Sequence, residues 1–375
     1  MKKRNLFSLF MMLFATGIMA QSYPSHEMYV DNGQPENIVD ALDAWEPGEP
    51  WNGDPDNVDE YFWISRVPLK NRFRPGDQAN DALDDTNNKK FCWMAPTGEM
   101  SKKWGALPRY NFDADNFNMW QYLDIHSNWT NGFWRVPGAF SDVAHKNGVK
   151  MGCTYFIDWG DVVNEESSAG KPLYELAEPG SNSHGDKYRY SRKLIQFLKY
   201  YGIDGLCFNP EGTWSAGVYN RIIPFLAECH KIAEELHHPF HVDWYSFVTN
   251  SGNLSDDGCK LSTNNNNWFH NTTYNQPVTD VFMLNYNWSE SGLQTSVQTA
   301  QNMGRSSFDV YAGFDMQGRG YGRNGNAGWN VLMKYPISIV IWGAHDRNQL
   351  YISSTEGGQS DYAVQNEYQK KQEMF

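Results

Sequence analysis

The sequence predicts an α/β fold, a (β/α)8 TIM barrel preceded by an irregular N-terminal extension. Apolar, strand-like runs alternate with helical segments from about residue 110 onward, which indicates βαβ units and a parallel sheet. Seven such strands are expected in one chain, and this number favours a closed barrel over an open sheet. Nearly every strand is followed by a carboxylate, an amide or an aromatic residue, as expected where the carboxyl ends of barrel strands form a site.

The expected strands are short apolar runs. They cover residues 120–125, 149–157, 203–208, 240–245, 281–288, 309–314 and 337–342. The expected helices have apolar residues at helical spacing and cover residues 140–147, 190–201, 219–237 and 294–303. Gly202 is placed to cap the second of these helices. The run 203–208 is apolar throughout, which predicts a strand buried on both faces.

Three segments are expected along the chain. Residues 1–20 resemble an export signal, because a basic start precedes a short apolar stretch that ends at Ala20. Residues 21–109 are acidic and rich in Pro, Gly and Asn, which predicts an irregular extension packed on the barrel. Residues 110–375 form the barrel. We therefore expect an exported protein, periplasmic or secreted, without a membrane span.

Composition narrows the classes of partner. The formal net charge of −13 argues against nucleic acid and favours a neutral ligand. Aromatic residues make up 15% of the chain, and several Trp lie in polar, loop-like sequence, which favours carbohydrate because flat sugar faces stack on such rings. Five scattered cysteines form no disulfide framework, and Cys153 and Cys207 are expected to be small core residues. Neither CxxC nor HExxH occurs, so no metal and no cofactor is expected.

The strongest evidence for a catalytic site in the sequence is the run that ends at Glu211. Strand alternation puts Gly205, Cys207, Asn209 and Glu211 on one face, with small residues below and polar residues above. An amide and a carboxyl would then project side by side over the barrel mouth. An isolated N-x-E motif has a simpler interpretation, in which Asn209 is a turn residue and Glu211 is a solvated charge on a loop.

This pairing has a chemical meaning. A 2-acetamido sugar can supply its own nucleophile, since its carbonyl oxygen attacks the anomeric carbon. The enzyme then needs one acid/base carboxyl and one group that holds the acetamido nitrogen. Glu211 suits the first role and Asn209 the second, while Tyr245 on the next strand is placed to bond the acetamido oxygen.

Two other interpretations stay open. A non-catalytic glycan-binding barrel would keep the aromatic residues and lack an acid/base group. A conventional two-carboxylate glycosidase would use Glu211 with Asp158 or Asp315, and a retaining pair would stand about 5 Å apart.

Six motifs follow one another between residues 120 and 345. They are Trp120–Asp124, Asp142–Val149, Asp204-Gly205 with Asn209-x-Glu211, Trp244-Tyr245, Asn285-Tyr286-x-Trp288 and Gly313–Gly320. As an ordered set they resemble glycoside hydrolase family 85, the endo-β-N-acetylglucosaminidases that act on N-glycans. The resemblance implies a retaining, metal-free, substrate-assisted cut in the GlcNAc-β-1,4-GlcNAc core of N-linked glycans on glycoproteins or glycopeptides.

The resemblance also implies roles for single residues. Glu211 would be the acid/base, Asn209 would orient the acetamido group and Tyr245 would assist. The candidate substrate-binding residues are Trp120, Trp159, Trp244 and Trp288 as subsite aromatics, with Asn285, Asp315 and Arg319 at strand ends. Arg319 could equally pair with Asp315. The family commonly has Asp at Ser246 and an aromatic residue at Gln317, which suggests an altered substrate subsite.

Overall fold

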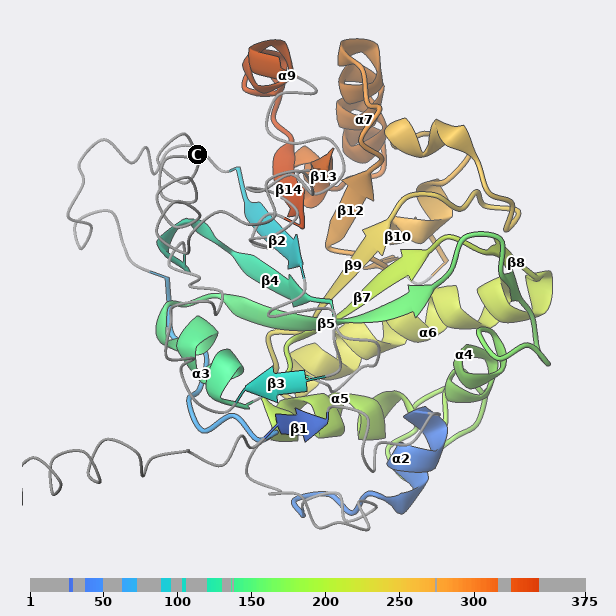
Figure 1. Ribbon diagram of the computed structural model, residues 1–375. Coiled ribbons are helices and arrows are strands. Elements are labelled where there is room, and N and C mark those ends of the chain that lie inside the picture. The colour runs from blue at the N-terminus through green and yellow to red at the C-terminus, as the bar shows by residue number, and fades with distance from the viewer. Residues whose placement is uncertain are drawn as a thin grey trace, which may run out of the picture.

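The computed structural model describes residues 27–29, 38–49, 63–72, 89–95, 103–105, 120–129, 136, 138–273, 275–315 and 325–343. Within these ranges eight parallel strands close into a barrel, in the ring order β2, β4, β5, β7, β9, β12, β13 and β14 (Figure 1). The prediction of a (β/α)8 barrel is confirmed. Among the described residues, no helix is long and apolar enough to cross a membrane.

The barrel strands are short, and six of them, all except β2 and β4, lie close to their predicted places. They are β2 (Phe91–Ala95), β4 (Ile125–Asn128), β5 (Lys150–Ile157), β7 (Gly205–Pro210), β9 (His241–Tyr245), β12 (Val281–Leu284), β13 (Val310–Asp315) and β14 (Ser338–Trp342). Outside the ring are the two-stranded pairs β1 (Glu27–Tyr29) with β3 (Lys103–Gly105), β6 (Val162–Val163) with β8 (Thr213–Trp214), and β10 (His270–Asn271) with β11 (Gln276–Pro277).

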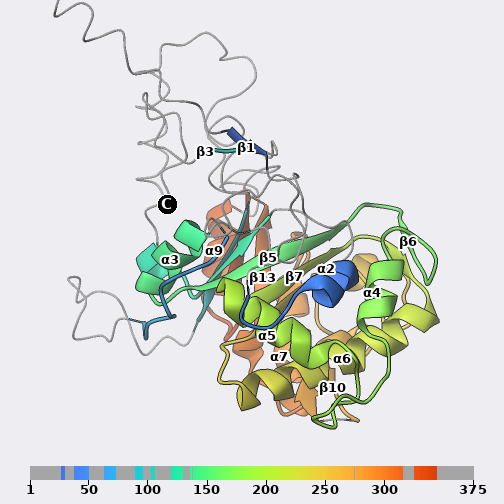
Figure 2. The same cartoon turned by 90° about the horizontal axis from the view of Figure 1, so that it is seen from below.

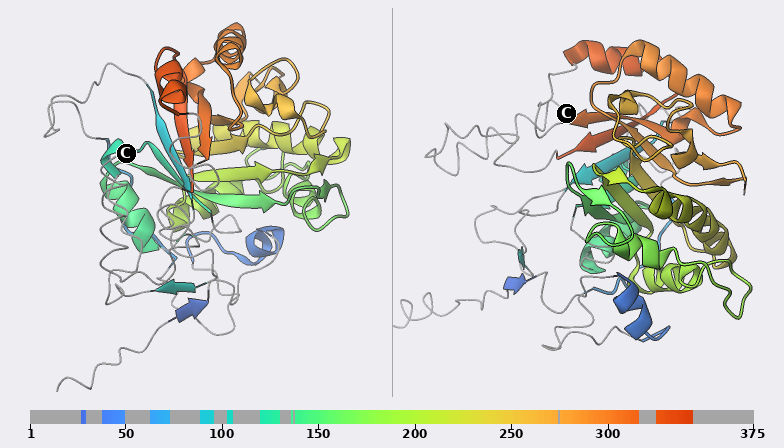
Figure 3. Two further views of the ribbon diagram at one scale, coloured as in Figure 1. Left: turned by 45° about the horizontal axis from the view of Figure 1, so that its top comes forward. Right: turned by 90° about the vertical axis from the view of Figure 1, so that its right-hand side faces the viewer.

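Helices cover the outside of the ring. They are α2 (Ile38–Ala44), α3 (Gly138–Lys146), α4 (Lys171–Leu176), α5 (Ser191–Tyr201), α6 (Ala216–Glu235), α7 (Glu290–Asn302) and α9 (Gly325–Leu332). Figure 2 shows α5 and α6 beside the strands, and Figure 3 shows the sheet between these helices on one side and α7 with α9 on the other. Gly202 ends α5 with a left-handed φ of 71°, as predicted. The described part of the β9–β12 connection has no α-helix and instead forms short 3-10 turns and the β10–β11 hairpin.

Two sequence-based boundaries are wrong. The first barrel strand, β2, lies within residues 21–109, which were assigned to the N-terminal extension. Its five residues stand alone in Pro- and Asn-rich sequence, and only closure between β14 and β4 requires a strand there. The run 120–125 is not a strand, because Trp120–Tyr122 forms a 3-10 turn and β4 begins at Ile125. The polar residues of β4 are fully buried. A search for apolar runs therefore does not identify this strand.

Alternation along the strands divides side chains between the lumen and the helix-covered outside. On β7, Leu206 and Phe208 belong to the outer core, whereas the Cys207 thiol meets Asp243 inside the ring. On β9, Trp244 packs outside, and Tyr245 joins the lumen cluster. The predicted common face of the β7 residues is therefore present. It leads from buried positions up to the carboxyl end of the strand.

A buried ion pair fastens α3 to the amino end of β7. The Nε2 atom of His145 lies 2.8 Å from Asp204 Oδ2, and its Nδ1 atom lies 2.6 Å from the carbonyl oxygen of Val67. Burial alone would lower the pKa of His145, but the hydrogen bond and charge of Asp204, with the Val67 carbonyl, raise it overall. Two acceptors require both ring nitrogens to donate, so the imidazolium form is favoured.

We expect His145→Ala to lower the free energy of unfolding by about 3 kcal/mol, because it leaves the buried Asp204 carboxylate without its partner. The stability that comes from a raised histidine pKa is fully present below the unfolded pKa of about 6.5 and is lost as pH rises through the folded pKa. The difference between wild type and variant in urea denaturation should therefore be larger at about pH 6 than at about pH 9. An equal difference at both pH values would contradict the ion pair, and His184→Ala, at an exposed position, is the control.

Candidate active site

The candidate site lies at the carboxyl end of β7, where an amide and a carboxyl meet. The Asn209 Nδ2 group donates a hydrogen bond to Glu211 Oε2 at 3.0 Å. Asn209 is buried as the fifth residue of the strand, and Glu211 follows the strand directly and is half-buried. The structure thus brings together the two residues on which the substrate-assisted interpretation depends.

The surroundings of Glu211 favour its protonated form. Burial raises the pKa of Glu211, the hydrogen bond from Asn209 opposes that shift, and the negative charge of Asp158 adds to it. The net pKa is raised. A carboxyl group that keeps its proton at higher pH is suited to donate that proton to a leaving group.

The backbone ties the loop after β5 to the loop after β7. The amide of Gly160 donates to the carbonyl oxygen of Glu211 at 3.2 Å, and the amide of Glu211 contacts the carbonyl oxygen of Ile157 at 3.4 Å. This connection holds Trp159 beside the carboxyl end of β7. Trp159 is 64% exposed and meets Phe247 edge-on, with ring centroids 5.1 Å apart. An exposed indole next to an acidic group is a suitable surface for a sugar ring.

Tyr245 ends β9, the strand next to β7. Its ring is buried in the lumen cluster, with centroids 5.6 Å from Phe247 and 5.8 Å from Tyr286. Strands β7 and β9 pair in parallel, with Phe208 opposite Trp244. Tyr245 therefore stands on the lumen face at the level reached by Asn209.

Two of the expected subsite tryptophans do not lie at the mouth. Trp244 is fully buried outside the ring and stacks on Trp268 with centroids 4.0 Å apart. It precedes Tyr245 by one residue, so strand alternation turns it to the opposite face. Trp120 precedes β4 at the amino end of the barrel, where it packs against Phe140 of α3. The structure does not bring either side chain to Asn209 and Glu211, and a subsite role for Trp244 and Trp120 stays a prediction without support from this arrangement.

The remaining candidates lie at strand ends or outside the described residues. Asn285 follows β12 and is buried, with its Oδ1 atom accepting from the backbone amide of Asn287 at 3.2 Å. Trp288 is also buried and donates from Nε1 to the carbonyl oxygen of Gly313 at 2.9 Å. Asp315 ends β13 and is half-buried. Arg319 lies outside the described residues, as does Gln317.

Ser246 has a structural contact in place of a subsite contact. Its side chain is buried, and its hydroxyl donates to the carbonyl oxygen of Gly258 at 2.6 Å. This bond holds the loop that follows β9 against the strand end. The family-typical Asp would have no proton to donate there when ionised.

An aromatic group at the mouth was not predicted as part of the site. Trp129 follows β4, Phe156 is in β5 and Trp342 ends β14, and each is partly exposed. The ring centroids of Trp129 lie 4.3 Å from Trp342 and 5.2 Å from Phe156. With the boundary of β4 placed correctly, strand alternation would have put Trp129 on the lumen face above Ser127. The sequence therefore contained enough information to place Trp129, but the wrong boundary of the strand predicted at residues 120–125 prevented this prediction.

Comparison with known proteins assigns the chain to a family. Residues 99–372 match the model of glycosyl hydrolase family 85. A cytosolic endo-β-N-acetylglucosaminidase of Gallus gallus is 26% identical over 336 residues, covering 85% of this chain and 40% of the relative. A cytosolic endo-β-N-acetylglucosaminidase 1 of Arabidopsis thaliana is 24% identical and covers 82% of this chain and 42% of the relative. The chain thus spans less than half the length of these relatives.

A solved structure shares the fold. The glycoside hydrolase domain of Endo-D from Streptococcus pneumoniae R6 superposes with a TM-score of 0.65 at 21% identity, covering 90% of this chain and 49% of that chain. At this identity the likeness shows the barrel fold alone.

The expected export is contradicted by the same comparison. The curated relatives from Gallus gallus, Danio rerio, Arabidopsis thaliana and Homo sapiens are all named cytosolic enzymes. These names contradict the exported destination that the basic and apolar start of the sequence predicts. Residues 1–20 themselves lie outside the described residues.

The family match covers well over half of the chain, and the motifs that resembled the family, from Trp120 onward, lie within it. The resemblance is therefore confirmed, and this chain belongs to glycosyl hydrolase family 85.

Proposed function

We propose that this chain is a retaining endo-β-N-acetylglucosaminidase that cleaves the GlcNAc-β-1,4-GlcNAc core of N-glycans by substrate-assisted catalysis. The observation that carries the proposal is the hydrogen-bonded pair of Asn209 and Glu211 at the end of β7. The family and the names of the curated relatives support the same reaction class. No cofactor enters the proposed chemistry.

The first step forms a ring within the substrate. Glu211 donates its proton to the glycosidic oxygen as the bond to the anomeric carbon breaks, and the acetamido carbonyl oxygen attacks that carbon. The products are an oxazolinium ion and the leaving GlcNAc, which stays on the peptide. In the second step the Glu211 carboxylate takes a proton from water, which attacks the same carbon and reopens the ring. Two inversions give net retention.

Asn209 orients the acetamido group. Its Nδ2 group donates to Glu211, which leaves Oδ1 directed at a different partner. In the proposed complex Oδ1 accepts the acetamido N–H, which increases the negative charge on the carbonyl oxygen that attacks. Tyr245 donates its phenol hydroxyl to that oxygen and fixes its direction of approach. Both contacts strengthen as charge develops. They therefore stabilise the transition state of the reaction more than the bound substrate.

The aromatic side chains at the mouth would bind the flat faces of the glycan. Trp159 lies in the loop that a backbone hydrogen bond ties to Glu211, while Trp129, Phe156 and Trp342 form the partly exposed group at the ends of β4, β5 and β14. Asp315 and Arg319 are assigned to sugar hydroxyls, and Asn285 and Trp288 support this side of the mouth from within.

Product analysis tests the proposed function. A purified preparation should convert a labelled N-glycopeptide into a peptide that carries a single GlcNAc and a free glycan with GlcNAc at its reducing end. Mass spectrometry distinguishes these products. Release of the whole glycan from asparagine, or binding of the glycopeptide without any cleavage, would contradict the proposal.

Glu211→Gln should reduce glycopeptide hydrolysis by about 10²–10⁴-fold, because the leaving oxygen then has no proton donor. The variant keeps the size of the side chain and its hydrogen-bonding capacity, so folding should be unchanged. Glu234→Gln, at an exposed position on α6, is the matched control and should retain full activity. Activity of Glu211→Gln within tenfold of wild type would remove Glu211 from the mechanism.

Asn209→Ala should hydrolyse the glycopeptide as poorly as Glu211→Gln and should still transfer sugar from a preformed oxazoline. Asn209 is needed to make the ring, whereas an oxazoline enters after that step and needs only Glu211 to deprotonate the acceptor. Transfer to a GlcNAc-peptide acceptor is measured by chromatography. If the variant fails equally with both donors, Asn209 has a structural role and the assisted mechanism loses its support.

The pH profile should depend on Asp158. Glu211 must be protonated to act as an acid, so kcat/KM falls as pH rises through its pKa. The charge of Asp158 favours the protonated form. Asp158→Asn should therefore lower the pKa of Glu211 and move the alkaline limb of the profile to lower pH, while activity at acidic pH is retained. Asp40→Asn on α2 should leave the profile unchanged. Loss of activity at every pH would instead identify Asp158 as a nucleophile.

A further inference from the structure

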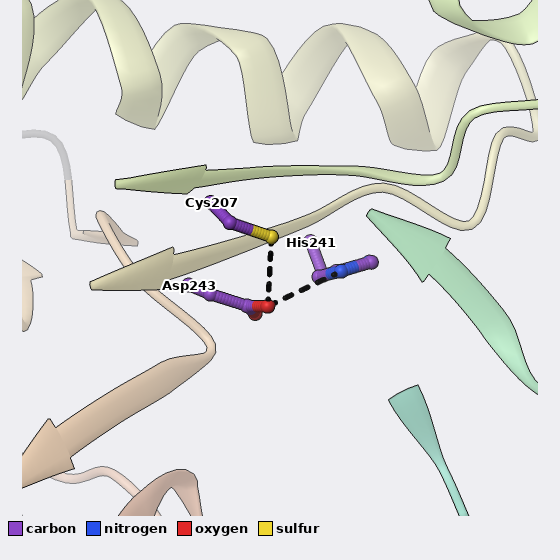
Figure 4. A group of neighbouring side chains, drawn as sticks. All are labelled: Cys207, His241 and Asp243. Atoms are coloured by element: carbon purple, nitrogen blue, oxygen red, sulfur yellow. Dashed lines mark hydrogen bonds and ion pairs between the residues drawn. The ribbon is translucent and has the colours of Figure 1, made fainter. Parts of the chain in front are cut away.

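Three ligand-type side chains meet in the barrel lumen below the proposed catalytic residues (Figure 4). Cys207 comes from β7, and His241 and Asp243 come from β9. Cys207 Sγ lies 3.1 Å from Asp243 Oδ2, and His241 Nε2 lies 3.7 Å from the same oxygen. Their ligand atoms all lie within 4.8 Å of one another, and all three residues are fully buried. The proposed reaction uses none of them.

Hydrogen bonding accounts for only part of this group, because the Cys207 thiol and the Ser127 hydroxyl both donate to the same atom, Asp243 Oδ2. Three buried atoms, the two ring nitrogens of His241 and the Oδ1 atom of Asp243, have no hydrogen-bond partner within the described part of the chain. The contact of 3.7 Å between the ring and the carboxyl is too long for a hydrogen bond. Burial of polar atoms without partners is costly, so native interiors rarely leave them so. A ligand that accepts these lone pairs would remove the cost.

Two glycines make room for the imidazole. A Cβ atom on Gly205 would lie 2.2 Å from atoms of the His241 ring. A Cβ atom on Gly152 would lie 2.7 Å from Cys207 Sγ and 2.9 Å from His241 Nε2. Any larger residue at either position would displace the ring or the thiol. The backbone of β5 and β7 is therefore shaped around the place where the three side chains meet.

The chemistry of the donor set matches zinc. A thiolate, an imidazole and a carboxylate are all Zn²⁺ ligands, and at bond lengths of about 2.0–2.3 Å tetrahedral ligands lie roughly 3.3–3.8 Å from one another. The measured contacts of 3.1 and 3.7 Å are close to that range. One thiolate and one carboxylate also balance the charge of a divalent ion, which suits a buried site.

We propose that Cys207, His241 and Asp243 bind a Zn²⁺ ion inside the barrel. The hydroxyl of Ser127, which contacts Asp243, or a water molecule that it holds, completes the tetrahedron. The ion would join β7 to β9, since Cys207 and Asp243 are paired in the strand register. Asn209 and Tyr245 each lie two residues further along these strands. The ion would therefore be structural, and it would enter during folding because the site is fully buried.

Metal content tests this inference independently of enzymatic activity. The protein is expressed in medium supplied with Zn²⁺ or, separately, with Co²⁺, and is washed with a chelator to remove weakly bound ions. We expect about one tightly bound ion per chain by elemental analysis. The Co²⁺ protein should show the absorption bands of a cobalt–thiolate bond. Fewer than about 0.1 ions per chain in the folded wild type, together with no thiolate band, would overturn the proposal.

Variants locate the ion. Cys207→Ala and Asp243→Asn should each lose the bound metal and have a lower Tm than wild type. Cys229→Ala is the matched control, because Cys229 is an equally buried thiol on α6, outside this group. Retention of about one ion by both site variants would place the metal elsewhere and overturn the assignment. If a site variant does not fold, the wild-type metal content and cobalt spectrum still decide the question.

Discussion

Closure of the parallel barrel is the constraint on which the rest of the structure depends. A closed ring gives every strand one face toward the lumen and one toward the helices, and a shift of one residue would exchange them. On β7 this constraint places Gly205, Cys207 and Asn209 in ascending order inside the ring and Phe208 outside it. The polar end of the strand can meet a substrate only because the residues below it are small enough for the lumen.

Periodicity made most of the fold predictable, whereas features that depend on closure were not. The Asn209–Glu211 pair could be predicted because both residues lie on one strand with a spacing of two. Strand β2 was missed because only its neighbours in the ring identify it. The order of the motifs predicted that Trp244 lies in the site. Strand alternation instead turns its side chain to the outside of the barrel, because Trp244 is one residue away from Tyr245. Cys207 and Asp243 come from different strands and meet through register, so no spacing along the chain indicates their contact.

The proposed site combines two kinds of support. Below the mouth, buried contacts fix the strands: His145 with Asp204 at the amino end of β7, and the thiol, imidazole and carboxyl group in the lumen. At the mouth, exposure rises, and Glu211 is half-buried, with a pKa that burial has raised. These buried contacts support the strand ends at which the acid lies next to the amide.

The most direct test of the central proposal is the configuration of the sugar that is first released. Proton NMR during the first turnovers of a glycopeptide reports the anomer at the new reducing end before it mutarotates. Substrate-assisted attack by the acetamido oxygen, followed by water, should give the β-anomer, because two inversions restore the starting configuration. First release of the α-anomer would mean a single displacement by water. That result would contradict the roles given to Asn209 and Glu211.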